Sequence, residues 1–392
     1  MSPDQKTPQK NVAFALGGLA GNNAHGAGFL YAALRYGINP QSISCTSGQI
    51  RTTHHYLKAL EDSKKTSKEQ AQAFHRAFLE DYKKSRPTGE ANLDLGLLML
   101  RGFPGVFRPA YESMALDIVS NGIRGLANNS YGQLTHTHWP LMMDQIMNWS
   151  TNRTLTPLTV MQSCQDIADT FNRSEIQLCF NAYDPLEGKE YVYFNKAAEA
   201  ARQASRKSYQ KVGYTKTPKS FRVECAIDAT AVRDALWLYA YGLNSKDNPR
   251  IDGAFFREIM LRELVEANLI ISVRPINHRW KGSALPDTYQ ATEDLKTEVG
   301  FDGSYSAERD NIHLINKLLA TKLLTPPPSG PAFHHIDLHE LEISIPRGYY
   351  DYALESYEVY DQAHHAALRA FKMHKLTEQA FQAPPPPPNY HA

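Results

Sequence analysis

The stretch that decides the fold is VAFALGGLAGNNAHGAGFLYAALRYGINPQSISCTSGQI, residues 12–50. It opens with an apolar run, Val12 to Leu16, which has the length of a buried strand and stops at two glycines. The spacing of apolar residues over 28–36 then predicts a helix that ends at Gly37. A second strand, 43–45, leads directly into a helix through about residue 60. Alternation of strand and helix on this scale indicates a parallel sheet.

The same α/β pattern returns after an interruption. The further predicted strands are 176–182, 191–194, 269–273 and 343–345, and the further predicted helices are 229–241, a segment from 254 to about 267, and 352–381. Between 62 and 152 the sequence carries charged amphipathic helices without a clear strand, which indicates a helical insertion beside the sheet. We therefore expect one domain over 11–380.

Both ends of the chain are expected to lie outside that domain. Residues 1–10 are polar and contain prolines, so they predict a disordered N-terminal tail. Residues 381–392 contain five consecutive prolines and predict an extended Pro-rich tail.

Composition excludes several classes of function. The 392 residues include 42 Lys and Arg against 41 Asp and Glu, and a net charge of +1 provides no field for bulk nucleic-acid binding. No run of about 18 uncharged apolar residues occurs, and the first residues lack the apolar core of a signal peptide. The four cysteines form neither a C-x-x-C pair nor a metal-ligand spacing. We expect a cytoplasmic protein with reduced thiols, no metal and no cofactor.

Ser47 is the strongest candidate for a catalytic residue. It stands between the second strand and its helix in the string Ser-Cys-Thr-Ser-Gly-Gln-Ile, residues 44–50. A sharp turn from strand to helix exposes the oxygen of a nucleophile at a helix N-terminus, where developing negative charge is favoured. The alternative is that Ser47 serves only as a helix N-cap.

The glycine-rich turn after the first strand, residues 16–23, is the second candidate. Its glycines, Gly17, Gly18 and Gly21, allow backbone N–H groups to form a small anion-binding nest. A dinucleotide-binding loop would need G-x-G-x-x-G and an acidic residue about 20 positions later, and both are missing. That third class of function, nucleotide binding, is therefore disfavoured.

Asp252 is the candidate base. It precedes Gly253 and Ala254 and follows an apolar residue, so its carboxylate could accept the proton of a serine hydroxyl. The alternative is again an N-cap. Asp302 has the same Asp-Gly dipeptide in a more polar segment and is a weaker rival.

The order of these motifs resembles the patatin-like phospholipases, which are acyl hydrolases with a Ser-Asp dyad. The shared order is a glycine-rich loop, a nucleophile elbow, a long gap and Asp-Gly-Ala. The resemblance covers residues 11–60 and 154–375, including the small-residue stretch and helix at 21–34, the strand pair at 176–194, and the segment 235–275.

This resemblance implies a three-layer α/β sandwich with a mainly parallel central sheet plus the helical insertion. It implies that Ser47 attacks an ester carbonyl and that Asp252 takes its proton. The backbone N–H groups that would receive the oxyanion are those of Gly17, Gly18, Leu19 and Gly48. The implied substrate is a phospholipid or another acyl ester, reached by peripheral contact with a membrane. The expected lipid-contacting side chains are Leu95, Leu97, Leu98, Met99, Leu100, Phe103, Val106 and Phe107.

The sequence departs from the family pattern at the elbow. The family has G-x-S-x-G, whereas Cys45 and Gln49 stand at the outer positions here, and Gln49 introduces a long side chain where the turn is crowded. The family's basic loop residue is replaced by Ala20 or Asn22. An alternative function follows: a patatin scaffold without catalysis that binds lipid or protein, with a Pro-binding partner for the tail.

Other polar clusters are assigned structural roles. The histidine groups at 54–55, 334–339 and 364–365 show no H-E-x-x-H pattern, so we interpret them as surface or hydrogen-bonded residues. His25, near the glycine loop, is expected to make a structural hydrogen bond. Residues 206–219 hold five Lys and Arg and no acid, which predicts a solvated loop or, as the alternative, contact with an anionic head group.

Overall fold

The structure is a computed structural model in which side chains and backbone are described for most of the domain. The described residues are 11–19, 21–90, 93–94, 97, 105–108, 158–210, 221–238, 249–274, 289–324, 333–341, 343 and 354–377. Both predicted tails and most of the predicted lipid-contacting residues lie outside these ranges.

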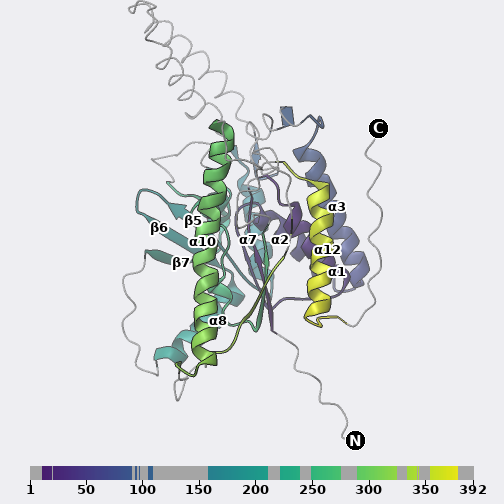
Figure 1. Ribbon diagram of the computed structural model, residues 1–392. Coiled ribbons are helices and arrows are strands. Elements are labelled where there is room, and N and C mark those ends of the chain that lie inside the picture. The colour runs from purple at the N-terminus through teal and green to yellow at the C-terminus, as the bar shows by residue number, and fades with distance from the viewer. Residues whose placement is uncertain are drawn as a thin grey trace, which may run out of the picture.

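A mixed, mostly parallel sheet forms the centre of the molecule (Figure 1). Its strand order is β10-β9-β1-β2-β5-β6-β7, and β8 pairs with β5. The strands are β1 Val12–Leu16, β2 Ser42–Cys45, β5 Gln177–Asp184, β6 Lys189–Phe194, β7 Arg222–Ala226, β8 Ile251–Asp252, β9 Leu269–Val273 and β10 Asp337–Glu340. From β10 to β5 all neighbours are parallel, whereas β6 and β8 run antiparallel to β5.

Helices cover both faces of this sheet. On one face, Phe14 and Leu16 of β1 share a hydrophobic core with residues of α1 Ala24–Arg35 and α12 Tyr357–Met373. On the other face, Ala13 and Ala15 share a second core with residues of α10 Tyr289–Ala320. Figure 1 shows α10 on one side of the sheet and α1, α3 and α12 on the other. The alternation of side chains along a buried strand therefore produces three layers.

Several elements lie where the sequence predicts them. The strands β1, β2 and β9 and the β5–β6 hairpin are confirmed, with bounds that differ by a few residues. Helix α2, Gln49–Glu61, also agrees with its prediction. Helix α1 begins at Ala24, earlier than predicted, and Gly37 follows its end with φ +65°, the backbone conformation that favours glycine.

Other predicted elements are wrong. The last strand is β10 at Asp337–Glu340 rather than 343–345, where Ile343 is not in a strand. The segment after Asp-Gly-Ala forms only two short 3₁₀ turns, η2 Gly253–Phe255 and η3 Arg262–Leu264, instead of a helix. Helix α9 is limited to Ala229–Ala235, and α12 is shorter than predicted.

Further elements were not predicted at all. They are α7 Met161–Arg173, α8 Lys196–Gln210, the edge strand β7, and the long helix α10. Helix α8 includes the first residues of the basic segment 206–219, which was predicted as a loop; residues 211–219 lie outside the described ranges.

The predicted insertion begins within the core. Helix α3, Ser67–Ser85, starts with a capping box between Thr66 and Glu69 and buries Phe74 and Phe78 beside α1 and α2. The short strands β3 Phe107–Arg108 and β4 Leu158–Thr159 pair with each other in antiparallel orientation.

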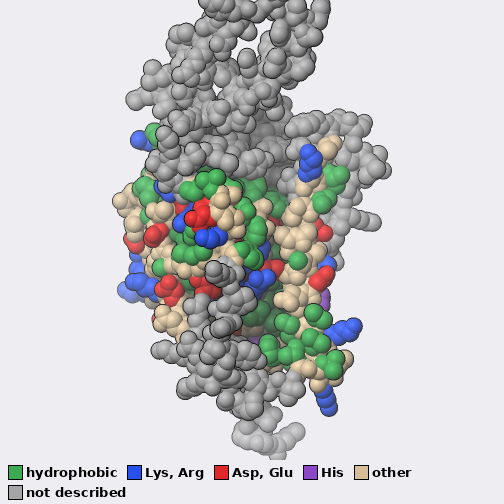
Figure 2. All heavy atoms as spheres, turned by 90° about the vertical axis from the view of Figure 1, so that its left-hand side faces the viewer, with side chains coloured by type: hydrophobic (Ala, Val, Ile, Leu, Met, Phe, Trp, Pro, Cys, Tyr) green, Lys and Arg blue, Asp and Glu red, His purple; other side chains and the backbone are tan. Residues whose placement is uncertain are grey.

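The described surface mixes both signs of charge. On the face shown in Figure 2, Lys and Arg side chains are interspersed with Asp and Glu, and hydrophobic side chains gather between them. Within the ranges that the structure describes, none of the helices combines the length and the apolarity that a membrane crossing requires.

Candidate active site

Ser47 occupies a strained turn between β2 and α2. Its φ is +50°, which is uncommon for a residue with a side chain. Such a conformation costs about 1–3 kcal/mol and persists only where the surrounding structure holds it. Ser47 is also only 2% exposed. The turn therefore has the geometry of a nucleophile elbow, which the strand-to-helix position of this serine predicts.

Asp252 lies beside Ser47 although 205 positions separate them in the chain, 252 minus 47. It is the last residue of β8 and pairs with Ala182 of β5, which places it at the carboxyl end of the parallel strands. The backbone N–H of Ala254 donates to its Oδ1 at 2.9 Å. The Ser47 side chain also hydrogen-bonds to the carboxylate. This second bond is loose, because Oδ2 meets no donor at full hydrogen-bond geometry among the described residues.

The environment of Asp252 changes its acidity. Complete burial raises the pKa of this carboxyl from 3.8 to about 7, although the hydrogen bonds from Ser47 and the Ala254 N–H act in the opposite direction. A carboxylate with a pKa near neutrality is a much stronger base than an exposed aspartate. The pair consequently joins a hydroxyl to a base whose charged form is poorly solvated.

Asn181 holds the turn that carries Asp252. Its Nδ2 donates to the carbonyls of Gly253 and Arg257, both at 3.3 Å. A side chain at Gly253 would place its Cβ 2.3 Å from the Asn181 amide carbon, so only glycine fits there. The Asp-Gly part of the motif is thus explained by close contact with a buried side chain on β5.

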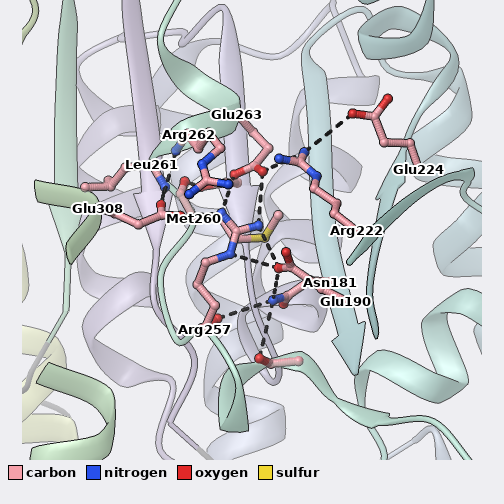
Figure 3. A network of polar contacts seen from close by, with 12 residues as sticks. Asn181, Glu190, Arg222, Glu224, Arg257, Met260, Leu261, Arg262, Glu263 and Glu308 are labelled. Carbon is pink, nitrogen blue, oxygen red and sulfur yellow. Dashed lines mark hydrogen bonds and ion pairs between the residues drawn. The ribbon is translucent and has the colours of Figure 1, made fainter. Parts of the chain in front are cut away.

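A buried charge network fixes the segment after this turn (Figure 3). Arg257 is 6% exposed and contacts the carboxylates of Glu190 at 2.7 Å, Glu263 at 2.9 Å and Glu308 at 2.6 Å. Arg222 adds a second cation at 2.7 Å from Glu263. Burial alone would raise the pKa of Glu263, but the two arginines lower it to about 2. These ion pairs connect β6, β7, α10 and the loop that follows Asp252.

The glycine-rich loop packs directly against the elbow. A Cβ at Gly18 would lie 2.5 Å from the Cβ of Ser47. The N–H of Gly17 donates to the Val273 carbonyl at 3.1 Å, and the N–H of Gly18 donates to Thr46 Oγ1 at 2.7 Å. Two of the four predicted oxyanion donors are therefore already bonded.

The other two predicted donors, Leu19 and Gly48, differ from these within the described residues. Within the part of the chain that the structure describes, the N–H groups of Leu19 and Gly48 have no hydrogen-bond acceptor. Gly48 also permits a close contact, because a Cβ there would lie 2.0 Å from Nδ2 of Asn23. These two N–H groups belong to the two segments that flank Ser47.

The residues at the outer positions of the elbow are both fully buried. Cys45 ends β2, and its Sγ lies 3.8 Å from the carbonyl oxygen of Cys179. Gln49 is directed toward α1, where it contacts Asn23 and His25, so its side chain does not crowd the turn. His25 makes the structural hydrogen bond that the sequence predicts, with its Nε2 at 2.6 Å from the Gly17 carbonyl oxygen.

Two further buried acids lie next to this site and were not predicted. Glu258 faces Gly17, and burial raises its pKa to about 7 despite Arg274 at 3.5 Å. Glu355 accepts the N–H of Asn23 at 3.1 Å at the start of α1, and burial raises its pKa to about 8. Neither acid belongs to one of the predicted motifs, although Glu258 lies six positions after Asp252.

A cleft adjoins the glycine loop on the side of α2 and α3. It encloses about 490 Å³ together with the solvent at its mouth. The residues that line it are Gly21, Asn23, Ala27, Arg51, Thr52, His55, Phe74, Phe78, Asp81, Ser85 and Glu355. Arg51 and His55 both bond to Asp81, at 2.6 Å and 2.8 Å, so these charges are already paired.

The remaining candidates lie elsewhere. The carboxylate of Asp302, on α10, is 3.3 Å from Arg274, and Asp252 rather than Asp302 meets Ser47. His334 bonds to the Ala267 carbonyl at 3.0 Å, as its structural interpretation predicts. In the described ranges, one group of side chains could hold a metal ion together: Asp361, His364 and His365, on one turn of α12.

No protein-family model matches the chain, and no curated protein matches it.

Proposed function

We propose that the chain is a serine acyl hydrolase of the patatin-like phospholipase type, with Ser47 as nucleophile and Asp252 as general base. The observation that carries this proposal is that the Ser47 side chain, in a buried and strained elbow, lies beside the buried carboxylate of Asp252. Further support comes from the mostly parallel sheet, because Ser47 and Asp252 both lie where parallel strands end.

The reaction begins with proton transfer from the Ser47 hydroxyl to the ionised carboxylate of Asp252. The serine oxygen forms a bond to the ester carbonyl carbon, and the carbonyl oxygen becomes an oxyanion. The N–H groups of Leu19 and Gly48 are the proposed donors that stabilise that charge. When the intermediate collapses, the ester C–O bond breaks and Asp252 gives its proton to the departing alkoxide.

The second half of the reaction regenerates the enzyme. A water molecule gives its proton to Asp252 and attacks the acyl carbon on Ser47. The serine oxygen then leaves and takes the proton back, which releases a carboxylic acid. Because the base must be ionised at the start of each cycle, the raised pKa of Asp252 predicts activity that increases with pH through neutrality.

The proposed substrate is a phospholipid or another acyl ester, reached at a membrane from the cytoplasmic side. One observation favours the second candidate function, a scaffold that binds lipid or protein without catalysis. Ser47 is 2% exposed, so a substrate reaches it only after neighbouring groups move.

A fluorophosphonate probe separates the two functions. The proposal expects covalent labelling of the wild type on Ser47, located by mass spectrometry, and loss of labelling in Ser47→Ala. Ester hydrolysis is lost in Ser47→Ala and Asp252→Asn. The matched controls Ser44→Ala and Asp302→Asn retain both activities, because neither side chain meets the dyad. Folded wild-type protein that neither reacts with the probe nor hydrolyses phosphatidylcholine or a short soluble ester would refute the proposal.

A further inference from the structure

Gln49 is the residue that departs most from the family elbow, and its side chain has a defined role in packing. It is the first residue of α2 and is 0% exposed. Its amide Nε2 donates to the Asn23 carbonyl oxygen at 3.3 Å and lies 2.9 Å from Nε2 of His25. The side chain thus extends from the elbow to the beginning of α1.

Space for this long side chain comes from a glycine on the facing helix. A Cβ at Gly26 would lie 1.9 Å from Oε1 of Gln49 and 2.5 Å from its amide carbon. In G-x-S-x-G the small residue occupies the position of Gln49 itself. Here the small residue is on α1 instead, so the crowding is relieved from the opposite side of the same contact.

His25 makes a second, separate contact with the glycine loop. Its Nε2 lies 2.6 Å from the carbonyl oxygen of Gly17. A carbonyl can only accept a hydrogen bond, so Nε2 of His25 carries the ring proton and donates it. This nitrogen cannot also accept from the Gln49 amide, so the 2.9 Å contact between the two nitrogens is a packing contact, and the hydrogen bond from Gln49 to this region is the one to the Asn23 carbonyl. Complete burial lowers the pKa of His25 to about 4, which keeps the ring neutral at physiological pH. The tautomer is therefore set by the bond to Gly17.

The peptide unit between Gly17 and Gly18 is consequently held at both of its ends. His25 binds its carbonyl oxygen, and Thr46 binds its N–H at 2.7 Å. A peptide unit is planar, so two such bonds prevent its rotation. The following N–H, that of Leu19, is one of the two that are free for an oxyanion.

We propose that Gln49 and His25 are positioning residues that fix the glycine loop relative to Ser47, so that the N–H of Leu19 faces the reacting carbonyl. This inference rests on the proposed acyl-hydrolase function. In this role the side chain of Gln49 stabilises the elbow. The small residue that the family pattern has at the position of Gln49 is replaced by Gly26 on the facing helix α1. Neither residue touches the substrate. They act through the orientation of the loop.

Paired variants test this role. Gln49→Met keeps the length of the side chain and removes its amide, and His25→Phe keeps a ring and removes its donor. We expect each to lower kcat for a short soluble ester by about tenfold or more, with KM changed by less than about twofold, because misplaced groups lose transition-state contacts. His25→Gln, which can still donate to the Gly17 carbonyl, retains most of kcat. Ile50→Met is the control for a volume change in the same helix.

Hydrogen exchange of the segment 17–23 provides a readout that does not depend on turnover. Faster exchange is expected in Gln49→Met and His25→Phe and not in Ile50→Met. If Gln49→Met and His25→Phe lower the melting temperature while kcat and exchange stay at wild-type values, the contact is packing only and the inference is overturned. Wild-type protein without any esterase activity would instead refute the proposed function, and unchanged exchange would then refute the loop connection as well.

Discussion

Asp252→Asn is expected to abolish activity and to stabilise the protein at the same time. The carboxyl is 1% exposed, and its pKa is raised from 3.8 in the unfolded chain to about 7 in the folded state. Between these two values the folded protein retains a proton that the unfolded chain releases. The contribution of Asp252 to stability therefore falls as pH rises through this window and is lowest above pH 7. At about 1.36 kcal/mol for each pKa unit, the loss amounts to about 4 kcal/mol.

The measurement compares urea unfolding of Asp252→Asn and wild type at several pH values. Asparagine keeps an acceptor for the N–H of Ala254 and carries no charge. The stabilisation by Asp252→Asn should be near zero at pH 4 and increase to at most about 4 kcal/mol at pH 8. Asp302→Asn is the control, since that carboxylate is 26% exposed and paired with Arg274. A difference that stays flat or shrinks as pH rises would show that Asp252 is not a buried base.

Three further predictions follow from the same contacts. For wild-type ester hydrolysis, kcat/KM should increase with pH to a plateau with a midpoint near 7, the raised pKa of Asp252; a flat profile from pH 5 to 9 would contradict its role as base. Arg257→Ala should lower the free energy of unfolding by about 3–5 kcal/mol in urea titrations, because it leaves buried carboxylates unpaired. Gly48→Ala should slow fluorophosphonate labelling by displacing Asn23, whereas Gly300→Ala, which meets nothing within 4 Å, should leave the rate unchanged.

The strands that sequence predicts correctly are those buried on both faces. β1, β2 and β9 are continuous apolar runs, because helices cover both sides of a central parallel strand. Edge strands lack that signal. β10 is half-exposed along its length and reads as the mixed string Asp-Leu-His-Glu, so the sequence favours the more apolar segment at 343–345 instead.

Helix α10, which the sequence does not predict, and the helix wrongly predicted from 254 to about 267 have a common cause. α10 packs through few apolar residues, among them Tyr305 and Ile312, and binds the network through Glu308, so its sequence has little amphipathic periodicity. The turns after Asp252 are held by Arg257 and its carboxylates instead of by a helical backbone. Such charges look like solvent-exposed residues in the sequence, because burial of a paired charge leaves no hydrophobic pattern.

For the site, local motifs identify Ser47 and Asp252 but not the residues that support them. Asn181 meets Gly253 from a position 72 residues earlier in the chain, and no spacing in the sequence indicates that contact. The crowding of the turn that the sequence predicts for Gln49 does not occur, for the same reason. Its side chain is accommodated by Gly26, a partner on another helix that becomes visible only in three dimensions.

The energetic cost of the site bears on the choice between enzyme and scaffold. Ser47 holds a strained backbone angle, and Asp252 and Glu258 are buried carboxyls whose pKa values are raised to about 7. Each of these features lowers stability at neutral pH, and single substitutions such as Asp252→Asn would relieve it. A module that only binds lipid or protein does not need a strained serine beside a destabilised base, whereas acyl transfer uses both. The combination therefore favours catalysis, and it predicts that the stabilising substitutions at this site and the inactivating ones are the same.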